Sequence, residues 1–132
     1  MLKAGGTGNK AGELNHHNWI FLDEQGGRHK VGIYHGPGTG NLMIYCNAKI
    51  VLIDFLVKKP KTYSFFINEE FCEIVLHEEE DKRFTYEFKI NKKVDTPLNK
   101  MRHARELKYM TYTIILLALF LLFLGIIVFL VF

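Results

Sequence analysis

The chain ends in a stretch, residues 112–132, that carries no charged side chain and is apolar on every helical face. A helix of this length reaches roughly 30 Å, the thickness of a bilayer's hydrocarbon core. The alternative, a buried core helix, normally shows a polar side. The pattern therefore predicts a transmembrane helix over 112–132, with anchoring side chains that include Tyr112, Ile114, Leu117, Phe120, Leu124, Ile127 and Phe132.

Before this stretch, short apolar runs alternate with turn residues. The runs cover 19–22, 28–35, 42–46, 50–56, 63–67, 71–76 and 83–91. In the last run Phe84, Tyr86, Phe88 and Ile90 alternate with polar residues, as in a strand with one buried face. Seven such runs without an amphipathic helix indicate an all-β sandwich or small barrel. We expect a compact antiparallel β-sandwich of about seven to eight strands.

The composition divides the chain into four parts. Residues 1–17, rich in Gly, Lys and Asn, are predicted to be a flexible leader, and 18–94 the β-sandwich domain. The glycines of residues 5–8 precede Lys10 but lack the strand, helix and Gly-Lys-Ser/Thr ending of a phosphate-binding loop. Residues 95–111 are a basic juxtamembrane connector. Pro97 disfavours a helix before it, whereas 98–110 could continue helically into the span.

The charges beside the span predict the topology. The net charge is +3, too small and dispersed to indicate nucleic-acid binding. No apolar signal stretch opens the chain, and basic residues dominate just before the span, which favours the cytosolic side. We therefore expect a single-pass, tail-anchored protein with its N-terminal domain in the cytosol. The long apolar span, with no basic residue after it, slightly favours ER or later membranes over the mitochondrial outer membrane.

Two groups of basic residues are candidates for contact with the membrane surface, one in a predicted loop and one beside the span. They are Lys58, Lys59 and Lys61, and Arg102, Arg105 and Lys108. A lysine near anionic lipid contributes about 1 kcal/mol. The alternative for the first group is an ordinary solvated loop.

Residues that could carry chemistry lack the necessary neighbours. Cys46 and Cys72 lie in apolar runs and are predicted to be buried thiols, not a disulfide. The one serine, Ser64, has no adjacent base. The acidic residues 78–81 are predicted to form a solvated turn, with cation binding as the weaker alternative. We therefore predict no enzyme activity, no catalytic or cofactor-binding residue and no small-molecule substrate.

The histidines show no spacing that preorganises zinc, so we predict no metal site. In a strand His16 and His17 point to opposite faces, while His29 and His35 share one. We expect these to be ordinary surface histidines.

The order of several short motifs resembles the Fas apoptosis inhibitory molecule family. The matching residues are Trp19, His35-Gly36, Gly38-Thr39-Gly40, Tyr45, Asn47-Ala48-Lys49, Phe84-Thr85-Tyr86-Glu87-Phe88 and Asn91-Lys92-Lys93. The resemblance covers about residues 18–94 and implies a non-catalytic antiparallel β-sandwich associated with protection from cell death and suppression of aggregation. Members usually have two such domains and no membrane segment. Ala48 and Lys92 replace the glycine expected in Asn-Gly-Lys hairpins, so the turn types are open.

Three functions follow as hypotheses. The first is a non-enzymatic, membrane-tethered protein-interaction module in the cytosol, whose partners are a membrane lipid and an unknown protein. The second is an accessory single-pass subunit of a larger membrane complex, which an exposed apolar patch on the sandwich would favour. A third, lipid binding inside the β domain, requires an open apolar cavity.

Overall fold

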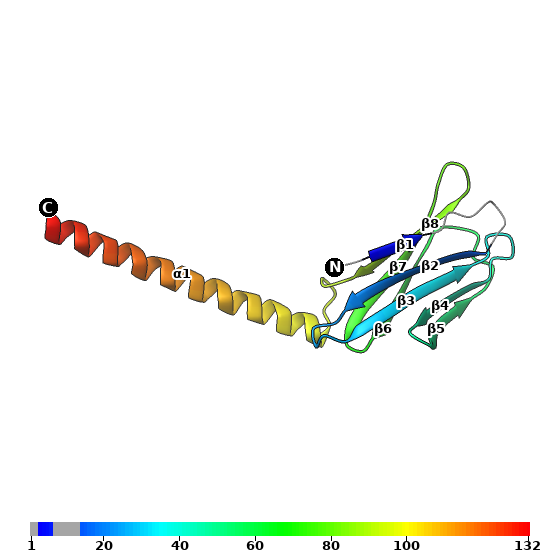
Figure 1. Cartoon of the computed structure of the whole chain (residues 1–132), viewed down its shortest axis with the longest axis horizontal. Helices are drawn as coiled ribbons and strands as arrows, with labels where there is room; N and C mark the ends of the chain where they lie inside the picture. Colours follow the sequence, from blue (N-terminus) through cyan, green and yellow to red (C-terminus); the bar gives the residue numbers. More distant parts are fainter. Residues whose placement is uncertain (1–2, 7–13) are drawn as a thin grey trace. The chain divides into compact units, whose positions relative to one another are not determined.

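The computed structural model describes the backbone of residues 3–6 and all atoms of residues 14–132. The chain forms two compact units, residues 1–92 and 93–132. Within the described residues, the first unit contains eight strands and the second a single helix, labelled in Figure 1. The predicted all-β domain followed by one apolar C-terminal helix is confirmed.

The first unit consists of two antiparallel sheets. The five-stranded sheet has the order β1-β2-β3-β4-β5, with strands β1 (Lys3–Gly6), β2 (Asn15–Leu22), β3 (Arg28–His35), β4 (Leu42–Cys46) and β5 (Lys49–Asp54). The three-stranded sheet has the order β6-β7-β8, with strands β6 (Lys61–Ile67), β7 (Glu70–Glu78) and β8 (Phe84–Ile90).

One core joins the inner faces of the two sheets. Alternate residues of β3, β4, β6 and β7 are buried, as the period of two requires, and Val31, Ile33 and Ile74 are inaccessible to solvent. The ring of Phe88 in β8 lies 5.8 Å from Trp19 and 5.5 Å from Phe21, both in β2. These contacts between strands of different sheets make the fold a sandwich.

Two hairpins use the same turn. Cys46 pairs with Lys49 across Asn47-Ala48, and Ile67 pairs with Glu70 across Asn68-Glu69. Asn47 has φ 55° and Asn68 has φ 52°, while the second turn residues have no positive φ. This is the pattern of a type II′ turn, with asparagine in the place usually held by glycine. Asn91-Lys92-Lys93 follows the last strand and forms no hairpin.

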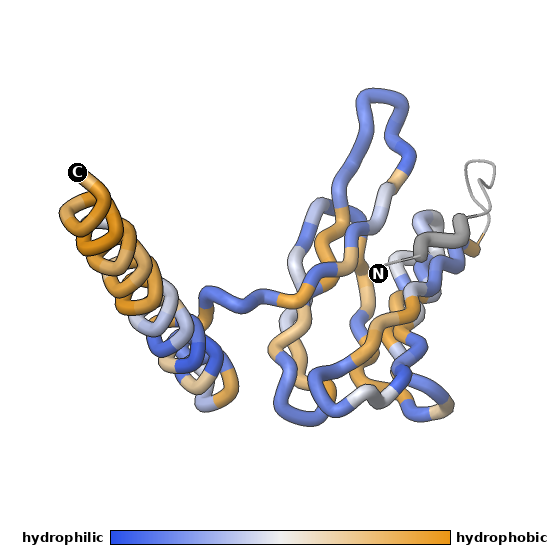
Figure 2. Tube along the Cα trace, turned by 60° about the vertical axis from the view of Figure 1, so that its left-hand side comes forward, coloured by the Kyte–Doolittle hydropathy of each residue, from blue (hydrophilic) through white to orange (hydrophobic). Residues whose placement is uncertain are grey.

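The helix α1 runs from Pro97 to Val131 without interruption. The Thr96 hydroxyl accepts a hydrogen bond from the Asn99 amide (3.2 Å), and proline occupies the first turn, where its missing N–H costs nothing. The helix thus begins at Pro97, one residue before the segment 98–110 that the sequence indicated could be helical. Figure 2 shows the change from hydrophilic to hydrophobic residues along α1.

The structure differs from the predicted boundaries near the N-terminus. Residues 3–6 pair with β2, and β2 itself begins at Asn15, so the predicted flexible leader over 1–17 is wrong for these residues. Backbone pairing with β3 extends β2 over His16 and His17, which carry no apolar signal. Residues 1, 2 and 7–13, which include Gly8 and Lys10 of the glycine-rich stretch, lie outside the described residues.

Candidate membrane anchor and protein-binding surface

Among the described residues, α1 is the one helix that is long and apolar enough to cross a membrane. It carries the predicted anchor residues Tyr112, Ile114, Leu117, Phe120, Leu124 and Ile127, and Phe132 caps its end. The most apolar part of this helix is not buried inside the described protein. The apolar side chains of this helix are therefore available to contact lipid.

The residues at the start of the apolar part of α1 have the chemistry expected at a membrane–water interface. Thr111 and Thr113 each donate a hydroxyl hydrogen bond (2.9 Å) to the carbonyl four residues earlier, so neither threonine carries an unpaired hydroxyl donor towards lipid. The Lys108 ammonium lies 5.8 Å from the centre of the Tyr112 ring. Aromatic and basic side chains of this kind are typical of the headgroup region.

Arg102 and Arg105, the other basic candidates on α1, lie within its first three turns. Arg102 donates to the Asn99 side-chain oxygen (2.9 Å), so its guanidinium is held near the start of the helix. Arg105 is exposed. With Lys108 these residues give the segment before the span its positive charge, the feature that attracts anionic lipid.

The three lysines of the predicted loop differ in their position and partners. Lys58 and Lys59 are exposed in the connection between β5 and β6. Lys61 instead begins β6, and its ammonium pairs with Asp54 at the end of β5 (2.6 Å). The prediction of Lys61 as a loop residue is wrong, because this ion pair and the pairing with β7 hold it in the sheet.

The outer face of the five-stranded sheet carries a cluster of aromatic and apolar side chains, which we call the outer patch. Its members come from four strands and are His16, Tyr34, Met43, Tyr45, Ile50 and Ile53. The His16 ring stacks on Tyr34 at 4.1 Å, and its Nε2 is hydrogen-bonded to the Tyr45 hydroxyl (2.8 Å). Ile50 is 60% exposed and Ile53 53% exposed.

A glycine makes room for the centre of the outer patch. Gly32 of β3 pairs with Tyr45 of β4, and the Tyr45 ring lies across it. A Cβ atom at Gly32 would lie 2.1 Å from this ring. The glycine therefore lets Tyr45 reach His16, so the patch depends on a residue that contributes no side chain.

The outer face of the three-stranded sheet is different in character. Paired residues there include Glu73 with Lys89, whose charged atoms are 3.4 Å apart, and His77 lies 3.4 Å from Glu87. Phe66 and Phe71 form one aromatic pair at the β6–β7 turn. The polar residues of this face thus form ion pairs, whereas the outer patch is mainly aromatic and apolar.

A buried hydrogen-bond network joins the two sheets. His35, at the end of β3, is fully buried; its Nε2–H donates to the Val57 carbonyl (2.8 Å), and its Nδ1 accepts from the Tyr86 hydroxyl (2.7 Å). The Asn15 side-chain amide donates to the same hydroxyl (3.0 Å). The network therefore ties β2, β3, β8 and the connection after β5 together.

The expectation of surface histidines is wrong for His29 and His35. Both lie on the inner face of β3, in phase with Val31 and Ile33, because alternate residues of a strand share a face. His16 and His17 do point to opposite faces: His16 joins the outer patch, and His17 stacks near Trp19 inside. Within the described residues, no three His, Cys, Asp or Glu side chains gather as metal ligands.

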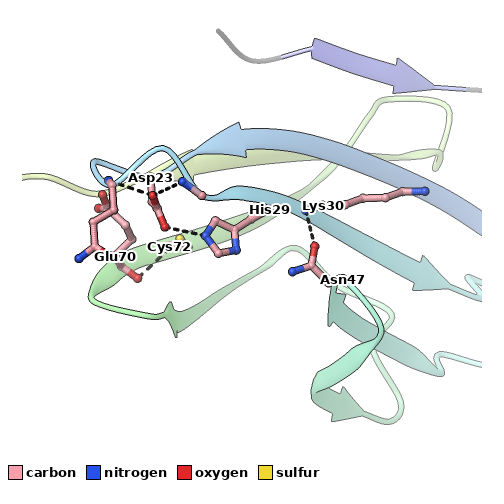
Figure 3. Close-up of polar contacts among 8 residues, drawn as sticks. Asp23, His29, Lys30, Asn47, Glu70 and Cys72 are labelled. Carbon is pink, nitrogen blue, oxygen red and sulfur yellow. Dashed lines mark hydrogen bonds and ion pairs between the residues drawn. The ribbon is translucent and has the colours of Figure 1, made fainter.

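His29 closes the turn that follows β2 (Figure 3). Asp23 accepts the amides of Gln25 (3.0 Å) and Gly27 (2.7 Å) through one oxygen and His29 Nε2 (2.8 Å) through the other. These bonds, that from His29 first, hold the pKa of Asp23 below its usual value. His29 Nδ1 is buried without a hydrogen-bond partner in the part of the chain that is described. The arrangement is structural, since the carboxylate is fully engaged.

The two cysteines are free, buried thiols, as predicted. Cys46 belongs to β4 and Cys72 to β7, where its Sγ donates to the Glu70 carbonyl (3.7 Å; Figure 3). Burial raises the pKa of both thiols, that of Cys72 to about 12. Neither forms a thiolate at neutral pH, which makes both poor nucleophiles.

The acidic turn is partly engaged by its own neighbours. β7 extends to Glu78, two residues beyond the predicted strand. Asp81 accepts hydrogen bonds from the backbone and guanidinium of Arg83, and the Thr85 hydroxyl donates to Glu79 (3.2 Å). The turn is thus an exposed β7–β8 connection held by local hydrogen bonds.

We expect the stability of the β domain to fall as the pH drops below about 6.5. Burial lowers the pKa of His35, and also that of His17, below the usual 6.5. Below pH 6.5 the unfolded chain therefore binds more protons than the folded chain. The stabilisation that comes from keeping these imidazoles neutral is complete above pH 6.5 and is lost as the pH falls below it. Urea unfolding at pH 7.5, 6.5 and 5.5 measures the effect, and a free energy of unfolding that stays constant over this range would contradict it.

The chain was compared with known proteins in three ways. No protein-family model matches it, and no curated protein or solved structure does. The resemblance to the Fas apoptosis inhibitory molecule family therefore stays a prediction.

Proposed function

We propose that the chain is a non-enzymatic protein-interaction module, tethered to a membrane by α1 with its β domain in the cytosol. The observation that carries the proposal is the contrast between the two sheet faces: one is charged, and the other presents the outer patch. Exposed patches of aromatic and apolar residues mark protein-binding surfaces, in which Tyr and Met are enriched. Tethering would restrict the domain to partners at one membrane and raise their effective concentration.

A second candidate is an accessory subunit of a larger membrane complex. The same outer patch favours it, because a subunit packs both its domain and its span against neighbours. The family resemblance adds a proposed cellular role, protection from cell death or suppression of aggregation, to either candidate.

Affinity purification of the full chain in mild detergent tests the proposal. Replacing Tyr34 and Tyr45 with serine removes the centre of the outer patch, and we expect bound proteins to be lost. Phe66→Ser is the matched control, since it removes an aromatic side chain that is 56% exposed on the other sheet. Partners that bind equally to all three chains would contradict binding through the outer patch.

Removing residues 112–132 separates the two candidates. A tethered module keeps its partner after this deletion, because the β domain alone makes the contact. An accessory subunit loses it, because the span contributes. Recovery of no specific partner with either chain would argue against both.

A further inference from the structure

Strand β5 forms one edge of the five-stranded sheet, and among the described strands it pairs only with β4. Its four central residues, 50–53, are Ile-Val-Leu-Ile, with neither charge nor proline among them. Ile50 and Ile53 are more than half exposed. An edge of this kind presents unpaired backbone groups beside apolar side chains, which is the template for adding another strand.

The other sheet protects its edges in the usual way. β8 alternates exposed Thr85, Glu87 and Lys89 along its solvent face, and β6 begins with Lys61. Charges at such positions oppose strand addition because a new strand would have to cover them. The protection that β5 does carry is the bulge in its ladder with β4, at Ile44/Tyr45.

The sequence of β5 is complementary to itself. It begins with Lys49 and ends with Asp54. If two copies pair antiparallel about a two-fold axis between residues 51 and 52, each Lys49 lies opposite the other copy's Asp54. Ile50 then lies opposite Ile53, so every opposed pair is either of opposite charge or apolar.

This register also agrees with the faces of the strand. Residues directly opposite in an antiparallel ladder point to the same face. Ile50 pairs with Tyr45 and Ile53 pairs with Met43, and all four lie on the outer face. Pairing Ile50 with Ile53 of a second copy therefore joins two outer patches into one surface.

We propose that β5 is a self-association edge, at which a second copy of this chain adds its own β5 antiparallel, with Lys49 opposite Asp54. The two sheets become one continuous sheet across the two-fold axis. Attachment to the same membrane raises the effective concentration of the copies and favours the contact. This proposal goes beyond the interaction module and stands if the outer patch binds no other protein.

A charge exchange tests the register. The full chain is studied by sedimentation equilibrium in density-matched detergent, where the wild type forms dimers. Lys49→Glu places two like-charged pairs in the dimer, and association weakens about tenfold. A second variant combines Asp54→Lys with Lys61→Asp, so that the ion pair within the chain is kept with its charges reversed. Self-association of this variant weakens to a similar degree. An equimolar mixture of the two variants has both pairs complementary and regains association within about threefold of the wild type.

Three further variants identify the surface. Ile53→Lys places a charge on the edge without touching either ion pair, and it abolishes dimers. Lys30→Glu, an equivalent charge reversal on the outer face of β3, and Tyr34→Ser/Tyr45→Ser leave association unchanged. Fluorescence of the single, buried Trp19 verifies folding of each variant. A monomeric wild type, a Lys49→Glu chain that dimerises like wild type, or a mixture without recovery overturns the proposal.

Discussion

Replacing His35 with leucine is expected to lower the free energy of unfolding by about 2–4 kcal/mol. Leucine fills much of the space but makes no hydrogen bond, so the Val57 carbonyl loses the donor that lies 2.8 Å away. The Tyr86 hydroxyl loses its acceptor at 2.7 Å and keeps only the bond from Asn15. Each buried polar group left unpaired costs about 1–3 kcal/mol. Urea unfolding in mild detergent, followed by Trp19 fluorescence, measures the change.

Two further chains test this explanation. His77→Leu makes the same replacement at a side chain that is 52% exposed, and its effect should stay within about 0.5 kcal/mol. Tyr86→Phe removes only the hydroxyl, and a double-mutant cycle with His35→Leu isolates the bond between them. Coupling indistinguishable from zero would mean that the network contributes little and that His35 acts through packing alone.

The strands that could be predicted from the sequence are those whose apolar alternation continues to their ends. β3 and β4 have the predicted bounds, and β8 differs by one residue at each end. β2 and β7 extend beyond their predictions because His16, His17, His77 and Glu78 carry no apolar signal. Backbone pairing with a neighbouring strand extends them, and pairing is not readable from one strand alone.

The outer patch and the buried network could not be predicted from the sequence, because both depend on the register between neighbouring strands. His16, Tyr34 and Tyr45 come from three strands and meet because His16 pairs with Tyr34 and Gly32 pairs with Tyr45. No spacing within one segment indicates such a contact. The burial of His35, however, had a signal, because His35 is in phase with Val31 and Ile33. A histidine on the apolar face of a strand predicts a buried, hydrogen-bonded imidazole.

Deletion of residues 112–132 is expected to move the protein completely from the membrane fraction to the soluble fraction. Most residues of this stretch are Leu, Ile, Phe or Val, each worth about −0.3 to −0.6 kcal/mol at the centre of a span, so their total is on the order of 5–10 kcal/mol. The basic residues before the span contribute about 1 kcal/mol each near anionic lipid, which gives reversible attachment at most. Extraction of cell membranes at alkaline pH distinguishes an inserted protein from a peripheral one.

The matched control replaces residues 112–132 with an equally long Leu–Ala stretch, which should keep the protein in the membrane fraction because hydrophobic length is what the bilayer requires. Lys58→Glu/Lys59→Glu should also leave it there, because the exposed lysines of the β5–β6 connection are not needed once the span is inserted. A glycosylation acceptor added after Phe132 reports the orientation, since it is modified in the ER when the β domain faces the cytosol. Release of the Leu–Ala chain by alkali would contradict anchoring by hydrophobicity, and an acceptor left unmodified on an ER-resident chain would contradict this orientation.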